Sequence, residues 1–145
     1  VAVDAFNANG KPLVIIGDGS ERLALQQKAQ ENIRFLGRQP FSSLQEHLEK
    51  AKAFIFPGIE DFGIAPVEAM AAGTPVIAFA QGGALETVVE GVSGLFFQEQ
   101  TATSLNEAIE RFEETRQGIT ADTCRSVAER FATSRFRQNI SRIIE

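Results

Sequence analysis

The chain contains no tryptophan, no tyrosine, and only one cysteine and one histidine among its 145 residues. A lone Cys124 excludes an internal disulfide, and with His47 as the single histidine it also excludes a Cys/His zinc cluster. Phenylalanine occurs 12 times. Any aromatic stacking on a bound ligand must therefore use Phe.

Long apolar runs and an excess of positive charge are also missing. No run approaches the roughly 20 residues that a membrane-spanning helix needs. The formal net charge of -5 argues against a nucleic-acid partner, whose phosphates require clustered Lys and Arg. The first residues show no signal-peptide pattern. We therefore expect a cytoplasmic protein, with at most peripheral contact to the inner face of the membrane.

Short apolar runs alternate with helical periodicity throughout the chain, and the length of 145 residues fits a single domain covering 1–145. The predicted strands are Leu13–Ile16, Ile33–Leu36, Ala53–Phe56, Pro75–Phe79 and Leu95–Phe97. Unbroken apolar runs are typical of parallel strands covered on both faces. We predict an α/β fold with a Rossmann-like, doubly wound parallel sheet of about five strands and helices on both faces.

The predicted helices lie between these runs. Six are given by their extent: Val1–Asn9, a segment ending near Ala29, Ile64–Ala72, Ala84–Glu90, Thr120–Phe131 and Ser134–Ile144. Two more are given by their apolar face, one with Phe41, Leu44 and Leu48 and the other with Leu105, Ala108, Ile109 and Phe112. Gly10 and Gly73 are predicted C-caps. Ser42 with Gln45, or Ser43 with Glu46, is predicted to form a capping box. Leu85, Val88 and Val89 are predicted to point inward.

One polar stretch, EDFGIAPVEAMAAG from Glu60 to Gly73, stands between a predicted strand and a predicted helix. Open α/β sheets bind ligands at such strand carboxyl ends. Glu60 and Glu68 offer carboxylates to sugar hydroxyls, and the N–H groups around residues 62–65 can hold a phosphate. Alternatively, Glu60 only stabilises the helix terminus and Glu68 is an ordinary surface residue.

This stretch, continued by TPVI, resembles the E-x7-E signature of retaining glycosyltransferases that have two Rossmann-like domains (GT-B). Further resemblance to their donor-binding domain lies in GDGSER (17–22), NIRFLG (32–37), GGALETVVEGVSGLFF (82–97) and EQTATSL (99–105). The pairing of EDFGIAPVEAMAAG with GGALETV most resembles bacterial polysaccharide mannosyltransferases. Asp61 differs, because many members have glycine there.

The resemblance implies the donor-binding half of a transferase that moves mannose from GDP-mannose in cell-surface polysaccharide synthesis, with UDP-linked sugars as the next choice. Alternatives are a non-catalytic nucleotide-sugar-binding module and an epimerase of the same architecture. The nucleotide sugar is then a substrate, and no cofactor is implied. No metal is implied either, because Glu60-Asp61 lacks the D-x-D arrangement of metal-using transferases.

The resemblance also assigns site residues. Glu60 is the implied catalytic residue, accepting hydrogen bonds from donor-sugar hydroxyls, and Glu68 would accept them from the ribose. The other implied donor-binding residues are Asp61, Phe62, Gly63, Ile64, Arg38, Gly82 and Gly83. The residues alone leave other readings open, since a lone arginine is often solvated and paired glycines also serve packing. Glu86 could instead be an acidic residue in the first turn of a helix, where the helix dipole favours negative charge.

A weaker signal is Gly17-Asp18-Gly19, a G-x-G without the third glycine of a dinucleotide fingerprint. It is equally a tight turn in which Asp18 or Ser20 caps the following helix.

Three parts of the resembling family lie upstream of Val1: the acceptor-binding domain, the basic residues that clamp the pyrophosphate, and the first strand of the donor domain. The missing strand would lie between Leu13–Ile16 and Ala53–Phe56. Its absence predicts either a closed gap with altered strand order or edge pairing with a second copy or another segment. The 145-residue chain alone is expected to be inactive.

Overall fold

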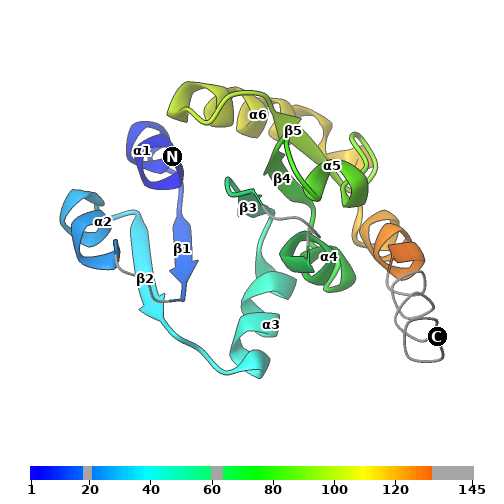
Figure 1. Ribbon diagram of the computed structural model, residues 1–145, viewed down its shortest axis with the longest axis horizontal. Coiled ribbons are helices and arrows are strands. Elements are labelled where there is room, and N and C mark those ends of the chain that lie inside the picture. Colours follow the sequence, from blue (N-terminus) through cyan, green and yellow to red (C-terminus); the bar gives the residue numbers. More distant parts are fainter. Residues whose placement is uncertain (18–20, 60–63, 132–145) are drawn as a thin grey trace, which may run out of the picture.

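Strands and helices alternate along the chain in the computed structural model, which describes residues 1–17, 21–59 and 64–131 (Figure 1). The order is α1 (Ala2–Asn9), β1 (Leu13–Ile16), α2 (Arg22–Lys28), β2 (Ile33–Gly37), α3 (Phe41–Lys50), β3 (Phe54–Phe56), α4 (Ile64–Ala71), β4 (Val76–Phe79), α5 (Ala84–Thr87), β5 (Gly94–Phe97) and α6 (Ala102–Thr115). A 3₁₀ turn, Arg116–Gly118, and a helix over residues 121–131 follow.

All strand pairs in the described residues are parallel, as the apolar runs predict. β1 pairs with β2, with Leu13 opposite Ile33. β4 lies between β3 and β5, with Ile77 opposite both Ile55 and Leu95. The α/β class, the five strands and their flanking helices are thus confirmed.

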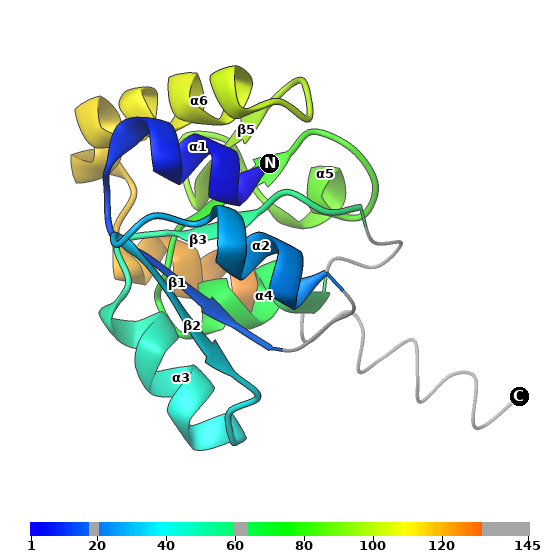
Figure 2. The ribbon, with the colours of Figure 1, turned by 90° about the vertical axis from the view of Figure 1, so that its left-hand side faces the viewer.

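The strands form two sheets, β1-β2 and β3-β4-β5, and the described residues contain no pairing between β1 and β3. The predicted closing of the gap is therefore wrong for this structure. Every residue of β4 and β5 is buried, whereas Val14 in β1 is 40% exposed. In Figure 2, β1 and β2 run toward the same side as β3 but at a clear angle to it.

Helices cover both faces of the β3-β4-β5 sheet. Figures 1 and 2 show α1 and α6 on one face, with α4 and residues 121–131 on the other. The predicted inward face of α6 is buried throughout and consists of Leu105, Ala108, Ile109 and Phe112. Burying a large apolar side chain contributes about 1.5–3 kcal/mol. This layer is the main source of stability for the sheet.

Helix α1 joins the two sheets. Gly10 ends it at φ 71°, the left-handed conformation predicted for this C-cap. On one side, the Asn106 side chain of α6 donates to the Ala5 carbonyl at 3.1 Å. On the other, the Asn32 amide, just before β2, donates to the Phe6 carbonyl at 2.8 Å. α1 is therefore bound both to the layer over β5 and to the β1-β2 sheet.

Two exposed ion pairs accompany these contacts. Lys28 lies 2.6 Å from Asp4, and Lys11 lies 2.8 Å from Glu113. The hydrogen bond from each lysine holds the pKa of its carboxyl partner below the usual value. Both pairs are solvated, so salt screens them and they contribute little to stability.

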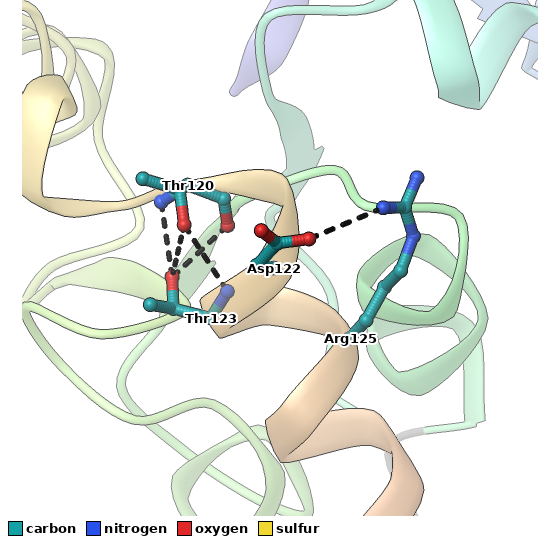
Figure 3. A network of polar contacts seen from close by, with 4 residues as sticks. All are labelled: Thr120, Asp122, Thr123 and Arg125. Atoms are coloured by element: carbon teal, nitrogen blue, oxygen red, sulfur yellow. Dashed lines mark hydrogen bonds and ion pairs between the residues drawn. The ribbon is translucent and has the colours of Figure 1, made fainter.

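The helix over residues 121–131 begins with a reciprocal cap (Figure 3). The Thr123 N–H donates to Thr120 Oγ1 at 3.2 Å, and the Thr120 N–H donates to Thr123 Oγ1 at 3.0 Å. The Thr123 hydroxyl also donates to the Val92 carbonyl at 2.7 Å. Figure 3 also shows Asp122 and Arg125, which form an ion pair at 3.7 Å. The cap therefore fixes the helix to the turn before β5.

Gly73 ends α4 at φ +86°, as predicted for its C-cap position. A side chain at residue 73 would also be crowded, because its Cβ would lie 2.9 Å from an Arg125 guanidinium nitrogen. Glycine is thus required here both by backbone conformation and by the close approach of the last helix.

Two local predictions are wrong. The capping box from Ser42 or Ser43 does not form, because α3 begins at Phe41 after Pro40, whose φ of -63° already suits a helix start. Ser43 instead donates to the Gln39 side chain at 3.0 Å.

Leu85 is the second wrong prediction, since it is 53% exposed rather than inward. The reason is that α5 is a single turn ending at Thr87, so the helical periodicity does not extend along the segment. Val88 is buried as predicted, and Val89 is partly buried.

Some predictions fall outside the described residues, namely the caps Asp18 and Ser20 and the helix Ser134–Ile144. Within the described part of the chain, no helix has both the length and the apolar character needed to cross a membrane.

Candidate functional site

The two sheets extend to opposite sides of the gap between β1 and β3, where the described residues contain no strand pairing (Figure 1). From β1 the chain passes through α2 to β2 on one side, and then returns through α3 to β3, from which β4 and β5 extend on the other side. Open α/β folds bind their ligands beside the carboxyl ends of strands at such a switch point. Figure 2 shows these strands running toward one side of the molecule. The loops on that side form the candidate site.

The ends of β1 and β2 are held together at this edge. The Gly17 N–H donates to the Gly37 carbonyl at 2.8 Å, and Gly37 has φ +69°. Its left-handed conformation turns the chain directly after β2 and leads to Arg38, whose side chain is exposed. Arg38 therefore lies at the predicted edge and is accessible to a ligand.

Helix α4 begins at the same edge, after the segment that follows β3. Its first turn contains Ile64, Ala65 and Pro66. Proline has no N–H and is tolerated in a first turn, where the backbone N–H groups have no acceptor within the helix itself. The terminus suits an anion. Glu68 is exposed one turn further along.

The paired glycines follow β4. Gly82 has φ +73°, so the left-handed turn itself requires glycine there. Gly83 is buried, and its carbonyl accepts the Thr87 hydroxyl at 3.3 Å. Both readings of the pair, packing and approach to a ligand, are compatible with this turn. Glu86 is exposed in the first turn of α5.

Arg38, the start of α4 and the turn at Gly82 thus each follow the carboxyl end of a strand, β2, β3 and β4 respectively. Four predicted site residues, Glu60, Asp61, Phe62 and Gly63, lie outside the described residues. For Ile64 the backbone is described and begins α4, while its side chain is not.

Arg22 is a residue at this edge for which the sequence suggested no role. A Cβ added to Gly37 would lie 3.1 Å from its Nη1, so the Arg22 guanidinium covers the turn before Arg38. The residue belongs to the GDGSER segment, which was the only signal available.

Gln100 was also missed. Its Nε2 donates to the Pro57 carbonyl at 3.0 Å, linking the turn after β5 to the end of β3. The two residues are 43 positions apart, so no local pattern could have shown the contact.

A metal centre is not found in the part of the chain that the structure describes. No group of three or more His, Cys, Asp or Glu side chains there could hold a metal ion. The chemistry available at this edge is backbone N–H donation, the Arg38 guanidinium and the Glu68 carboxylate.

Comparison with known proteins identifies the family. Residues 4–131 match the family described as glycosyl transferases group 1, which covers most of the chain. The chain belongs to the group 1 glycosyl transferases.

Curated members of this family with similar sequences include two mannosyltransferases. The alpha-1,3/1,6-mannosyltransferase ALG2 of Dictyostelium discoideum is 37% identical over 93 residues, covering 61% of this chain and 22% of that protein. A GDP-mannose-dependent phosphatidylinositol monomannoside mannosyltransferase of Corynebacterium glutamicum is 33% identical over 108 residues, covering 67% and 28%. The chain therefore spans about a quarter of the length of these relatives.

Solved structures of group 1 neighbours show the same fold. The Anabaena protein HepE, in complex with UDP and glucose, superposes with a TM-score of 0.79 at 23% identity, covering 96% of this chain and 43% of that one. At this identity the likeness establishes the GT-B-type fold alone.

Proposed function

We propose that this chain is the donor-binding half of a retaining glycosyltransferase that transfers mannose from GDP-mannose in the synthesis of a cell-surface polysaccharide. The observation that carries the proposal is the place of α4, which begins after the carboxyl end of β3 with the exposed Glu68 one turn further along. The names of the mannosyltransferase relatives support the choice of sugar and of base. A Vi polysaccharide biosynthesis protein of Salmonella typhi, 32% identical over 130 residues, supports the choice of pathway class.

The proposed chemistry follows from what sugar transfer demands. As the nucleoside diphosphate leaves, negative charge grows on phosphate and positive charge on the anomeric carbon. The N–H groups at the start of α4, together with those of Phe62 and Gly63, would stabilise the phosphate. Glu60 would accept hydrogen bonds from donor-sugar hydroxyls, and Glu68 from the ribose. Neither glutamate has to donate a proton.

The remaining proposed contacts surround this centre. Asp61 and Ile64 would flank the donor, Arg38 would lie beside the nucleobase, and Gly82-Gly83 would permit close backbone approach. No cofactor or metal takes part in the proposal, since the nucleotide sugar is a substrate. The acceptor-binding domain and the basic pyrophosphate clamp are assigned to other parts of a longer protein in the cytoplasm, in at most peripheral contact with the membrane.

A second candidate donor is a UDP-linked sugar. It is favoured by one observation, that the neighbour HepE was solved with UDP-glucose and superposes with a TM-score of 0.77. Because that neighbour is 23% identical, the mannosyltransferase relatives at 33% and 37% weigh more in the choice.

Calorimetry on the full-length protein tests the donor. GDP, UDP, ADP and their sugars would each be titrated, and we expect GDP and GDP-mannose to bind best. Preferential binding of UDP compounds would show that the donor is a UDP-linked sugar and not GDP-mannose. Binding of GDP-mannose without any transfer would instead favour the non-catalytic module.

The stereochemistry has a separate readout. The anomeric configuration of the product, read by NMR coupling constants, should match that of the donor. An inverted product would contradict the retaining mechanism. An epimerised free sugar nucleotide would favour the epimerase alternative.

A further inference from the structure

The carboxyl end of β2 contains an extra residue. The register between β1 and β2 shifts after Ile15, so that Ile16 pairs with Gly37 and Leu36 is left over in β2. Such a bulge bends the strand and redirects the side chains that follow it. Gly37 then turns the chain at φ +69°, and Arg38 comes next with an exposed side chain. The direction of Arg38 is therefore set by the bulge and the turn.

The side chain of Gln39 closes this turn. Its Nε2 donates to the Leu36 carbonyl at 2.8 Å, three positions back along the chain. Gly37 and Arg38 are thus enclosed between that carbonyl and the side chain that binds it. The Arg22 guanidinium lies against the same turn, since a Cβ at residue 37 would be 3.1 Å from its Nη1. The backbone on both sides of Arg38 is therefore held by contacts.

Gln39 is itself held by α3. The Ser43 hydroxyl donates to Gln39 Oε1 at 3.0 Å, so both polar atoms of the Gln39 amide are hydrogen-bonded. Near the other end of α3, the hydroxyl of the buried Thr74 donates to the Leu48 carbonyl. Thr74 lies between α4 and β4. Helix α3 thus connects the turn after β2 to the half of the domain that contains α4 and Glu68.

We propose that Gln39 is a positioning residue for recognition of the donor nucleobase, acting by fixing the turn that presents Arg38. This inference rests on the proposed function, in which Arg38 lies beside the base. A guanidinium is planar and can donate two parallel hydrogen bonds to O6 and N7 of guanine, an acceptor pair that uracil does not offer. Ordering a long side chain is a cost of binding, and a backbone fixed beforehand lowers that cost. Gln39 thereby favours GDP over UDP.

The experiment compares Gln39→Leu with Gln45→Leu in the full-length protein. Gln39→Leu removes both amide hydrogen bonds without adding charge, and Gln45→Leu makes the same change at an exposed position of α3. Calorimetry should show roughly two- to tenfold weaker GDP binding for Gln39→Leu, the range of one neutral hydrogen bond. UDP binding should weaken less, so that the preference for GDP narrows. Binding of inorganic pyrophosphate, which has no base, should be equal in the two variants.

Arg38→Ala shows whether Gln39 acts through Arg38. In the Arg38→Ala background, Gln39→Leu should cause no further loss of GDP affinity, because changes to coupled residues do not add. A general loosening of the fold would instead weaken GDP binding equally in both backgrounds. Such additivity would overturn the proposal. So would an unchanged GDP affinity in Gln39→Leu, or a wild type that binds UDP more tightly than GDP.

Hydrogen exchange separates this inference from the proposed function. The Gly17 N–H donates to the Gly37 carbonyl at 2.8 Å, so exchange of this amide reports how firmly the turn is held. It should be faster in Gln39→Leu than in Gln45→Leu, with or without nucleotide. Equal exchange in the two variants would overturn the positioning role. Faster exchange in Gln39→Leu, combined with a wild type that binds no nucleotide, would uphold the fixed turn and refute the donor-binding function.

Discussion

Gly94 in β5 lies directly against the Val76 carbonyl of β4. A Cβ at position 94 would be 1.9 Å from the Val76 oxygen and 3.0 Å from a Val88 methyl group. The Val76 backbone cannot shift to make room, because Val76 pairs with both Phe54 and Gly94 in the centre of the sheet. The glycine is therefore required by space, in a strand where glycine is otherwise unfavourable.

Gly94→Ala should accordingly destabilise the fold by about 3 kcal/mol or more, the upper range for overpacking a core. The urea midpoint of unfolding measures this loss. Gly118→Ala is the matched control, because nothing lies within 4 Å of its added Cβ. Similar midpoints for the two variants would show that β4 and β5 can separate to admit a methyl group.

Glu68→Gln should weaken nucleotide binding on the proposed assignment. A hydrogen bond to a charged group contributes about 1.5–3 kcal/mol, so bare GDP should bind roughly ten- to 150-fold more weakly. Calorimetry on the full-length protein measures the change. Glu110→Gln on the exposed side of α6 is the control. Unchanged affinity for GDP and UDP in the Glu68 variant would show that Glu68 does not bind the ribose hydroxyls.

Glu60→Gln should behave differently. As its proposed partner is the sugar, the variant should lose turnover and discrimination between sugars more than affinity for the bare nucleotide. Steady-state kinetics with GDP-mannose, combined with GDP titrations, separate the two effects. A variant with wild-type kcat would contradict the catalytic assignment.

Cys124 makes stability depend on pH at alkaline values. Burial raises the pKa of its thiol from 9.0 to about 11, and the side chain is 0% exposed. The unfolded thiol loses its proton at lower pH than the folded one, so the free energy of unfolding falls as pH rises from about 9 toward about 11. Below pH 9 this contribution is fully present.

Urea unfolding of wild type and Cys124→Ala between pH 7 and pH 10.5 checks this expectation. The difference in unfolding free energy between the two proteins should shrink with rising pH. Parallel curves over the whole interval would mean that the thiol ionises in the folded state as easily as in the unfolded state.

Within the described residues β1 pairs with β2 alone, and its other edge should make the 145-residue chain associate with itself. An exposed edge offers backbone groups to another strand, and Val14 adds 40% exposed apolar surface. Light scattering should report a mass that rises with concentration. Val14→Lys should lower this mass, whereas Val92→Lys, at a residue 38% exposed on the turn before β5, should not. A concentration-independent monomer would refute the expectation.

The secondary structure was largely predictable because its causes are local. The apolar run Leu13–Ile16 coincides with β1, and the buried face of α6 follows its periodicity. Gly10 and Gly73 both adopt the left-handed conformation that their place after a helix predicts. Prediction failed at Leu85, because α5 ends at Thr87 and its buried residues are Ala84 and Thr87.

The site was only partly predictable. Arg38 follows β2 and Gly82 follows β4, as the sequence predicts, whereas their role at a ligand site stays a prediction and Glu60 lies outside the described residues. The contact between Gln100 and Pro57 joins residues that are 43 positions apart. The Arg22 guanidinium lies beside Gly37 although helix α2, a turn and strand β2 separate the two residues along the chain. Such contacts depend on how elements pack, so neither residue type nor spacing indicates them.

Helix α1 lies between the two sheets, and this position affects how cooperatively the domain unfolds. The β1-β2 sheet has no ladder to β3 in the described residues. It is joined to the other half through α1, by the hydrogen bonds of Asn106 and Asn32 and by an apolar core that includes Phe6 and Ile33. Elements that share no strand ladder can open as separate units. We therefore expect amides of β1 and β2 to exchange through partial unfolding, at lower free energy than those of β4, which would exchange only when the whole domain melts.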